Sequence, residues 1–258
     1  MKIEVIDSDG KVVDTIAGSK HRGINRATWS MRLKPPTVPP AASAAFGAAT
    51  GPRVLPGTYT VKMTKGDQVY TSNLKLVLDP RASYNEQDRR QQFDLAMKLY
   101  NMMARMSFAV DSMVNLRDAA TARAAKLPAN DALRKNVQDF SQQVDALRSK
   151  IVATKEGGAI TGEERIREYL TGVYGDVNNY DGKPTNSQIE RTDALGRELE
   201  DVIKELDQLT TKQLPTINTG LQKKKLEPIQ PMTQQQWEKT HQGNTGSQPG
   251  LMGMRERD

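Results

Sequence analysis

The pattern of hydrophobic and polar positions changes its period once along this 258-residue chain, near residue 80. Before that point apolar and polar residues alternate, which is typical of β-strands with one buried face. After Asp79-Pro80-Arg81 the apolar residues recur every three or four positions, which is the period of amphipathic helices. We therefore predict an α+β protein with a β domain at 1–80, a helical domain at 84–226 and a flexible tail at 227–258.

The strand signal is clearest at 58–63, which follows a Pro-Gly turn, and at 68–78, which returns after a second glycine turn. Residues 2–7 and 12–16 predict a hairpin around Asp9-Gly10, because glycine tolerates the positive φ of a tight turn. These four segments predict an antiparallel sheet.

A further strand is predicted at 25–32, with Ala27, Trp29 and Met31 on one face. A single tryptophan at a strand centre favours a core plug over a sugar-stacking platform. The Pro- and Ala-rich stretch at 33–56 offers few ladder donors and little to bury, so it predicts a long surface loop. Such a loop is either functional or a plain insertion, and the second is favoured.

The second half of the chain predicts helices from a cap at 85–88 to about 126, from 131 to about 154, from about 161, and from about 187 to 214. Pro215 should kink or end the last of these. The helix from 131 has the cleanest apolar seam, with Phe140 at its centre. Short connections favour an antiparallel helical bundle over an extended coiled coil.

Composition excludes several classes of protein. No apolar run approaches the roughly 20 residues that span a bilayer, and the strand-like N-terminus does not read as a signal peptide. There is no cysteine, so disulfides and thiolate chemistry are excluded. The net charge is +6, with its densest run at 223–225, yet no aromatic residues interleave with the basic ones. We therefore predict a solvated positive surface and no nucleic-acid partner.

No catalytic, cofactor-binding or metal-binding residue is predicted. His21 and His241 stand far apart in the sequence, and His241 lies in the predicted tail. Two groups of glutamates sit among Arg and Lys at helical spacing and read as surface ion pairs rather than a glycosidase dyad: Glu163, Glu164 and Glu168, and Glu198, Glu200 and Glu205.

Two further features predict packing or docking. A cluster of methionines is more typical of core filling than of an adaptable binding face: Met97, Met102, Met103, Met106 and Met113. Trp237 suggests that the tail docks somewhere.

Three motifs of the β part occur in a specific order: 7–13 (DSDGKVV), 23–32 (GINRATWSMR) and 56–61 (PGTYTV). They resemble the immunoglobulin-like module of flagellar hook-capping proteins. The same order is similar to the C-terminal region of large bacterial proteins with sortilin-type or BNR-repeat β-propellers, often labelled glycosyl hydrolases. There, as in this chain, an Asp-Pro-Arg junction and a helical region with Gln-Phe-Asp-Leu-Ala follow, here at 92–96. The resemblance covers roughly residues 2–230.

The resemblance implies an immunoglobulin-like antiparallel β-sandwich followed by the helical bundle. It implies a non-catalytic accessory region that packs on the propeller of the same protein or complex, or binds another protein, in an exported bacterial protein (periplasmic, outer-membrane-associated or secreted). Met1 stands where the second strand of the module begins, so we expect a piece of a longer protein. The alternatives are a glycan-contacting appendage of a glycoside hydrolase whose catalytic residues lie in the propeller, and a free-standing adhesion or scaffold subunit.

Overall fold

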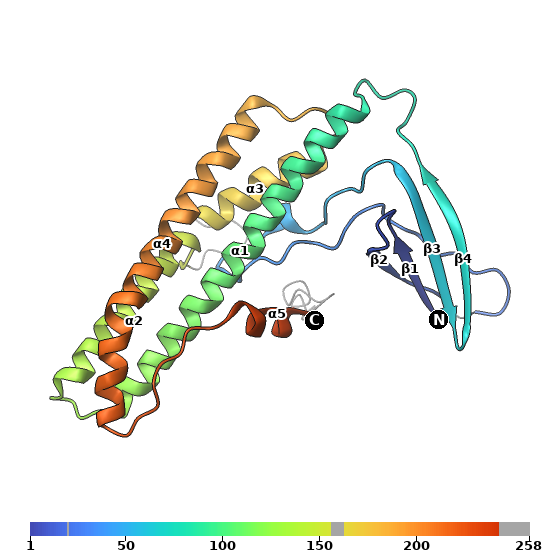
Figure 1. Ribbon diagram of the computed structural model, residues 1–258. Coiled ribbons are helices and arrows are strands. Elements are labelled where there is room, and N and C mark those ends of the chain that lie inside the picture. The colour runs from blue at the N-terminus through green and yellow to red at the C-terminus, as the bar shows by residue number, and fades with distance from the viewer. Residues whose placement is uncertain (20, 156–162, 243–258) are drawn as a thin grey trace, which may run out of the picture. The chain divides into compact units, whose positions relative to one another are not determined.

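The computed structural model describes residues 1–19, 21–155 and 163–242 of the chain (Figure 1). These residues contain a four-stranded antiparallel sheet and five α-helices, so the α+β prediction is confirmed. They form two compact units. The sheet unit consists of 1–36, 46–101 and 172–191, and the helical unit of 37–45, 102–171 and 192 onwards. The unit borders at 101/102, 171/172 and 191/192 fall inside helices, and a domain boundary between 80 and 84 stays a prediction.

The sheet consists of β1 (Lys2–Ile6), β2 (Val12–Ala17), β3 (Gly57–Lys65) and β4 (Gln68–Leu76), in the order β2-β1-β3-β4. All neighbours are antiparallel. Gly10 and Gly66 have φ of +80° and +58° in the two tight turns, which explains why glycine stands there. All four of these strands were predicted from the alternating pattern.

The prediction of a strand at 25–32 is wrong. Within it the structure has no strand, only one isolated bridge between Arg32 and Arg53. The side chain of Asn25 accepts from the backbone N–H of His21 and donates to its carbonyl, which folds the chain back locally. Met31 has φ of +58°, outside the β region. The described residues therefore contain one sheet, and they do not confirm a two-sheet sandwich.

Trp29 nevertheless packs on the sheet, as predicted for a core residue. The core cluster consists of Val5, Val13, Val54 and Tyr59, and the partly buried Trp29 lies against it. The rings of Trp29 and Tyr59 meet edge to face with centroids 5.1 Å apart. Trp29 thus belongs to the core without belonging to a strand.

The five helices are α1 (Glu86–Ala125), α2 (Ala132–Ile151), α3 (Ile166–Asn179), α4 (Asn186–Lys223) and α5 (Gln234–Gln242). Asn85 caps α1 as predicted: its side chain accepts from the N–H of Asp88, and the Asp88 carboxylate accepts from the N–H of Asn85. The predicted break at Gly157-Gly158 and the predicted helix start at Thr161 lie outside the described residues.

Helix α4 does not end at Pro215. Leu214, Ile217 and Leu221 are buried on either side of the proline. Burial of three such side chains, at about 1.5–3 kcal/mol each, outweighs the roughly 3 kcal/mol cost of proline in a helix interior.

In the helical unit, α2 runs antiparallel to both α1 and α4. Arg117 of α1 binds Asp145 of α2 at 3.0 Å, and one turn further along α1, Thr121 meets Ser141 at 3.0 Å. Lys150 of α2 binds Glu205 of α4 at 2.7 Å, and Gln143 and Gln213 pair nearer the other end of both helices. The predicted α2 seam is buried at Val137, Phe140, Val144, Leu147 and Ile151.

The prediction of a flexible tail is wrong for 227–242. Ile229 and Trp237 are buried, and Gln234–Gln242 forms α5. The Asn218 side chain accepts from the N–H of Ile229 at 2.8 Å and donates to its carbonyl at 3.0 Å, so it replaces a strand partner for that residue. The remainder of the predicted tail, 243–258, lies outside the described residues. Among the described helices, none combines the length and the apolar character that crossing a membrane requires.

Replacing Phe140 by Asp should unfold the helical unit, because the new carboxylate would be buried without a partner in place of a fully buried ring. We expect a loss of about 3 kcal/mol or more, measured by urea unfolding followed by circular dichroism. The control Gln138→Asp introduces the same charge at an exposed position of α2 and should change stability little. Equal melting of the two variants would contradict the placement of Phe140.

Candidate functional site

An exposed apolar surface of the sheet unit lies on β4, one of the two edge strands. β4 is nine residues long, and all of its residues except Leu76 are exposed. Among the described strands its one neighbour is β3. The backbone groups on its other side therefore face outward, as at any sheet edge.

The core face of the sheet continues onto this edge. In the register of β3 and β4, Tyr59 pairs with Leu74 and Met63 with Tyr70, so these side chains share a face. Tyr59 is buried, whereas Tyr70 and Leu74 are 49% and 42% exposed. The apolar face thus extends beyond the part that the core cluster covers.

β4 lacks most of the devices that protect sheet edges. It contains no proline, its register with β3 runs from Gln68 to Leu76 without a bulge, and Lys75 is its single charged residue. Natural edge strands are usually short, bulged or charged, because an open edge is a template for another strand. An edge of this kind has the geometry to accept a further strand.

The segment 46–56, which precedes β3, is held by side-chain donors. Arg89 of α1 donates to the carbonyl of Arg53 at 2.6 Å, Tyr174 of α3 donates to that of Thr50 at 2.8 Å, and Asn178 of α3 donates to that of Gly51 at 3.2 Å. Burial lowers the pKa of the Arg89 guanidinium, which nevertheless stays charged because arginine is not deprotonated in proteins. Burial raises the pKa of the Tyr174 hydroxyl, because it disfavours the charged form of either group, so Tyr174 stays a neutral donor.

The prediction of a surface loop at 33–56 is wrong for the part at 46–56, which these hydrogen bonds hold against α1 and α3. The segment is irregular apart from the short 3₁₀ helix at Phe46–Ala48, as expected. However, Ala48, Gly51, Pro52 and Val54 are buried. Small residues and prolines bury little by themselves, but their backbone packs closely once its carbonyls have donors.

Trp29 and Tyr59 do not form an open platform for a sugar ring. Tyr59 is 7% exposed, and its hydroxyl donates to the carbonyl of Leu55 at 2.6 Å. The indole N–H of Trp29 is buried without a hydrogen-bond partner among the described residues. Both rings therefore serve the core of the sheet unit.

The prediction that the methionines fill the core is confirmed for Met103, Met106 and Met113, which are fully buried.

The two histidines lie in different units, His21 in an exposed turn and His241 in α5. Within the described part of the chain, no three His, Asp or Glu side chains are arranged to hold a metal ion.

The prediction of glutamate ion pairs holds for Glu200 and Glu205, which bind Arg105 and Lys150. Glu163 is also ion-paired, but the predicted surface position is wrong, because its side chain is buried. One oxygen of Glu163 accepts from the backbone N–H groups of Thr154 and Lys155 at 2.8 and 3.0 Å, and the other binds Arg165 at 2.6 Å. The backbone donors, followed by Arg165, lower the pKa of Glu163 from its usual 4.5 to about 2.

The sequence alone does not identify β4 as an exposed edge. Its alternating pattern predicts a strand but does not say which strands stand at an edge, because that depends on sheet order. Comparison of the chain with protein families, curated proteins and solved structures finds no match.

Replacing Trp29 by Phe should leave stability nearly unchanged. The substitution keeps an aromatic ring against Tyr59 and removes an N–H that is desolvated without a bond. Trp29→Ala should cost about 3 kcal/mol, because it leaves a cavity. Thermal melting of both variants tests this; equal losses would show that the indole N–H has a partner.

Glu163 should stabilise the fold in a pH-dependent way. Its carboxyl has a lower pKa in the folded than in the unfolded chain, so its contribution is fully present above the unfolded value near 4.5 and is lost as pH falls toward about 2. In urea unfolding, the stability difference between the protein and Glu163→Gln should be positive at pH 6 and shrink between pH 4.5 and 2. A difference independent of pH would contradict this role, and Glu164→Gln serves as a control.

Proposed function

We propose that this chain is a non-catalytic interaction region that binds another polypeptide, and that β4 is the surface it uses. The observation that carries the proposal is the open edge: nine residues, no proline or bulge, and two exposed apolar side chains that continue a buried face. Strand addition to such an edge gains backbone hydrogen bonds along its length, and side-chain contacts to Tyr70 and Leu74 provide specificity.

The resemblance to propeller-associated modules supplies the identity of the partner in this proposal. The chain is the C-terminal accessory region of an exported bacterial BNR-repeat or sortilin-type protein. Its sheet belongs to an immunoglobulin-like sandwich, and α1, α2 and α4 belong to an antiparallel bundle. The partner is the β-propeller of the same protein or complex. The order of the three β motifs and the paired helices of the helical unit support this assignment.

The glycan-contacting alternative has less support. The ring of Trp29, the residue considered for sugar stacking, packs against Tyr59, and Tyr59 in turn lies in the core with its hydroxyl donating to Leu55. Carbohydrate-stacking sites need an accessible aromatic face, which Tyr59 lacks.

Site-specific photo-crosslinking tests the proposal. A photoreactive phenylalanine analogue at Tyr70, introduced in the organism that makes the protein, should give one discrete adduct with another polypeptide. Mass spectrometry should place the linked peptide in a β-propeller. Leu74→Lys should abolish the adduct, because the charge disrupts the apolar face next to the crosslinker.

Tyr180 provides the control position, since it is 59% exposed but lies outside the sheet. The same analogue there should give no adduct. Absence of an adduct at residue 70 would refute the interaction surface. An adduct with a protein that has no propeller would refute the proposed partner while keeping the surface.

A further inference from the structure

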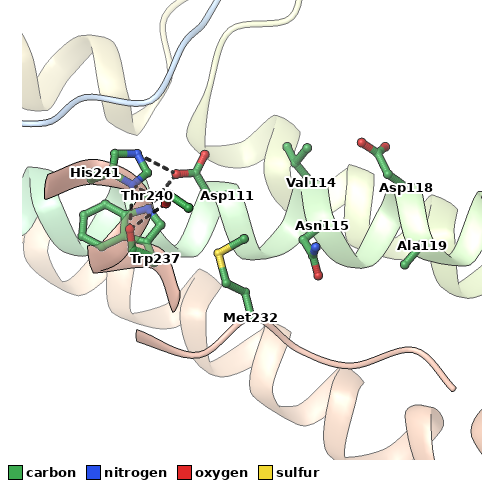
Figure 2. A pocket seen from close by; sticks show the side chains of 9 residues that line it. All are labelled: Asp111, Val114, Asn115, Asp118, Ala119, Met232, Trp237, Thr240 and His241. Atoms are coloured by element: carbon green, nitrogen blue, oxygen red, sulfur yellow. Dashed lines mark hydrogen bonds and ion pairs between the residues drawn. The ribbon is translucent and has the colours of Figure 1, made fainter. Parts of the chain in front are cut away.

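A second surface lies in the helical unit, where α5 and the segment before it pack on α1. They leave a pocket of about 590 Å³, called here the α1–α5 pocket (Figure 2). Asp111, Val114 and Asp118 line it from α1, and Met232, Trp237 and His241 line it from the C-terminal segment. This site is independent of β4, and its test is independent of the proposed function.

Asp111 is held in a defined orientation at one end of the pocket. One of its oxygens, Oδ2, accepts from the indole N–H of Trp237 at 2.7 Å and lies 3.5 Å from Nε2 of His241. Figure 2 shows both interactions. The other oxygen makes no bond to either ring, and the side chain of Asp111 is 28% exposed. The carboxylate is thus fixed but still accessible.

The aromatic side chains that position Asp111 are themselves well packed. Trp237 is 6% exposed, meets Phe108 edge to face at 6.0 Å, and stacks on His241 at 4.4 Å. The ring of His241 is held in turn through Nδ1, 2.9 Å from the carbonyl of Trp237. The carboxylate is therefore preorganised, which reduces the entropy cost of binding a ligand.

The charge of the pocket contrasts with that of the chain. The chain carries a net charge of +6, yet none of the residues that line the pocket is Lys or Arg. Asp118, at the other end, is bound by Arg117, which does not line the pocket. Between the two carboxylates the lining combines the apolar side chains of Val114 and Met232 with the amide of Asn115.

We propose that the α1–α5 pocket binds an alkylammonium group, with the ammonium on Asp111 and the alkyl stem along Val114 and Met232. A carboxylate paired with a primary ammonium makes a charge-assisted hydrogen bond, which is roughly twice as strong as a neutral one. A methylene stem gains by leaving water for apolar side chains. A carboxylate ligand would meet Asp111 and be repelled.

The two tryptophans of the chain allow a direct measurement, because Trp29→Phe leaves Trp237 as the single reporter. The probe is n-pentylammonium chloride, and 1-pentanol is its neutral match. Titration should change the fluorescence of Trp237 saturably with the ammonium and much less with the alcohol. Added salt should weaken only the ammonium, since partly exposed charges are screened. Equal responses to both probes would refute the proposal.

Asp111→Asn is the decisive variant. Its amide oxygen can still accept from Trp237, so α5 should stay docked, while the affinity for pentylammonium should fall about tenfold. Asp139→Asn is the matched control: it removes the same charge from an exposed position of α2 and should bind like the parent. Unchanged affinity in Asp111→Asn would overturn the assignment.

Met232→Arg gives a second route to the same answer if Asp111→Asn fails to fold. It places a guanidinium in the pocket without removing the bond between Trp237 and Asp111, and it should abolish binding by occupying the carboxylate. Retained binding would overturn the site. Competition by Nα-acetyl-lysine amide then distinguishes the sources: displacement assigns the group to a lysine of a polypeptide, and no displacement assigns it to a free amine.

Discussion

Backbone carbonyls of irregular segments need donors, and in this protein helix side chains supply them. The sheet unit depends on this most, because 46–56 brings Val54 into the core cluster. Arg89, Tyr174 and Asn178 donate to the segment from α1 and α3. A buried carbonyl without a donor costs about 1–3 kcal/mol, so several together would expel the segment and uncover the core.

The helical unit uses the same device at other places. Arg167 donates to the carbonyl of Pro39 at 2.7 Å and Ser107 to that of Thr37 at 3.0 Å, which holds the first part of the Pro-rich stretch. Asn218 pairs with both backbone groups of Ile229. Each donor lies on a regular helix whose own backbone bonds are internal. Rigid helices therefore position irregular segments whose backbone forms few helix or sheet hydrogen bonds of its own.

The two surfaces proposed for binding differ in kind from these internal contacts. β4 offers backbone groups that pair with no second strand among the described residues, beside Tyr70 and Leu74, which suits a partner strand. The α1–α5 pocket offers a fixed carboxylate, Asp111, which suits a cation. In both cases a well-packed aromatic side chain lies next to the surface: Tyr59 on the neighbouring strand β3, and Trp237 in the lining of the pocket. The packed ring keeps each surface in place before a ligand arrives.

The sequence by itself determined the local elements: the four strands, the capped start of α1 at Asn85 and the buried seam around Phe140, because periodicity and capping act over a few residues. It predicted a core role for Trp29 and docking for Trp237 without identifying their partners, and it wrongly placed Glu163 on the surface. Trp29 reaches the core without a strand, Glu163 is buried by backbone donors, and Trp237 docks on Asp111. Only the tertiary structure decided these outcomes, along with the edge position of β4, because each depends on partners far away in the chain.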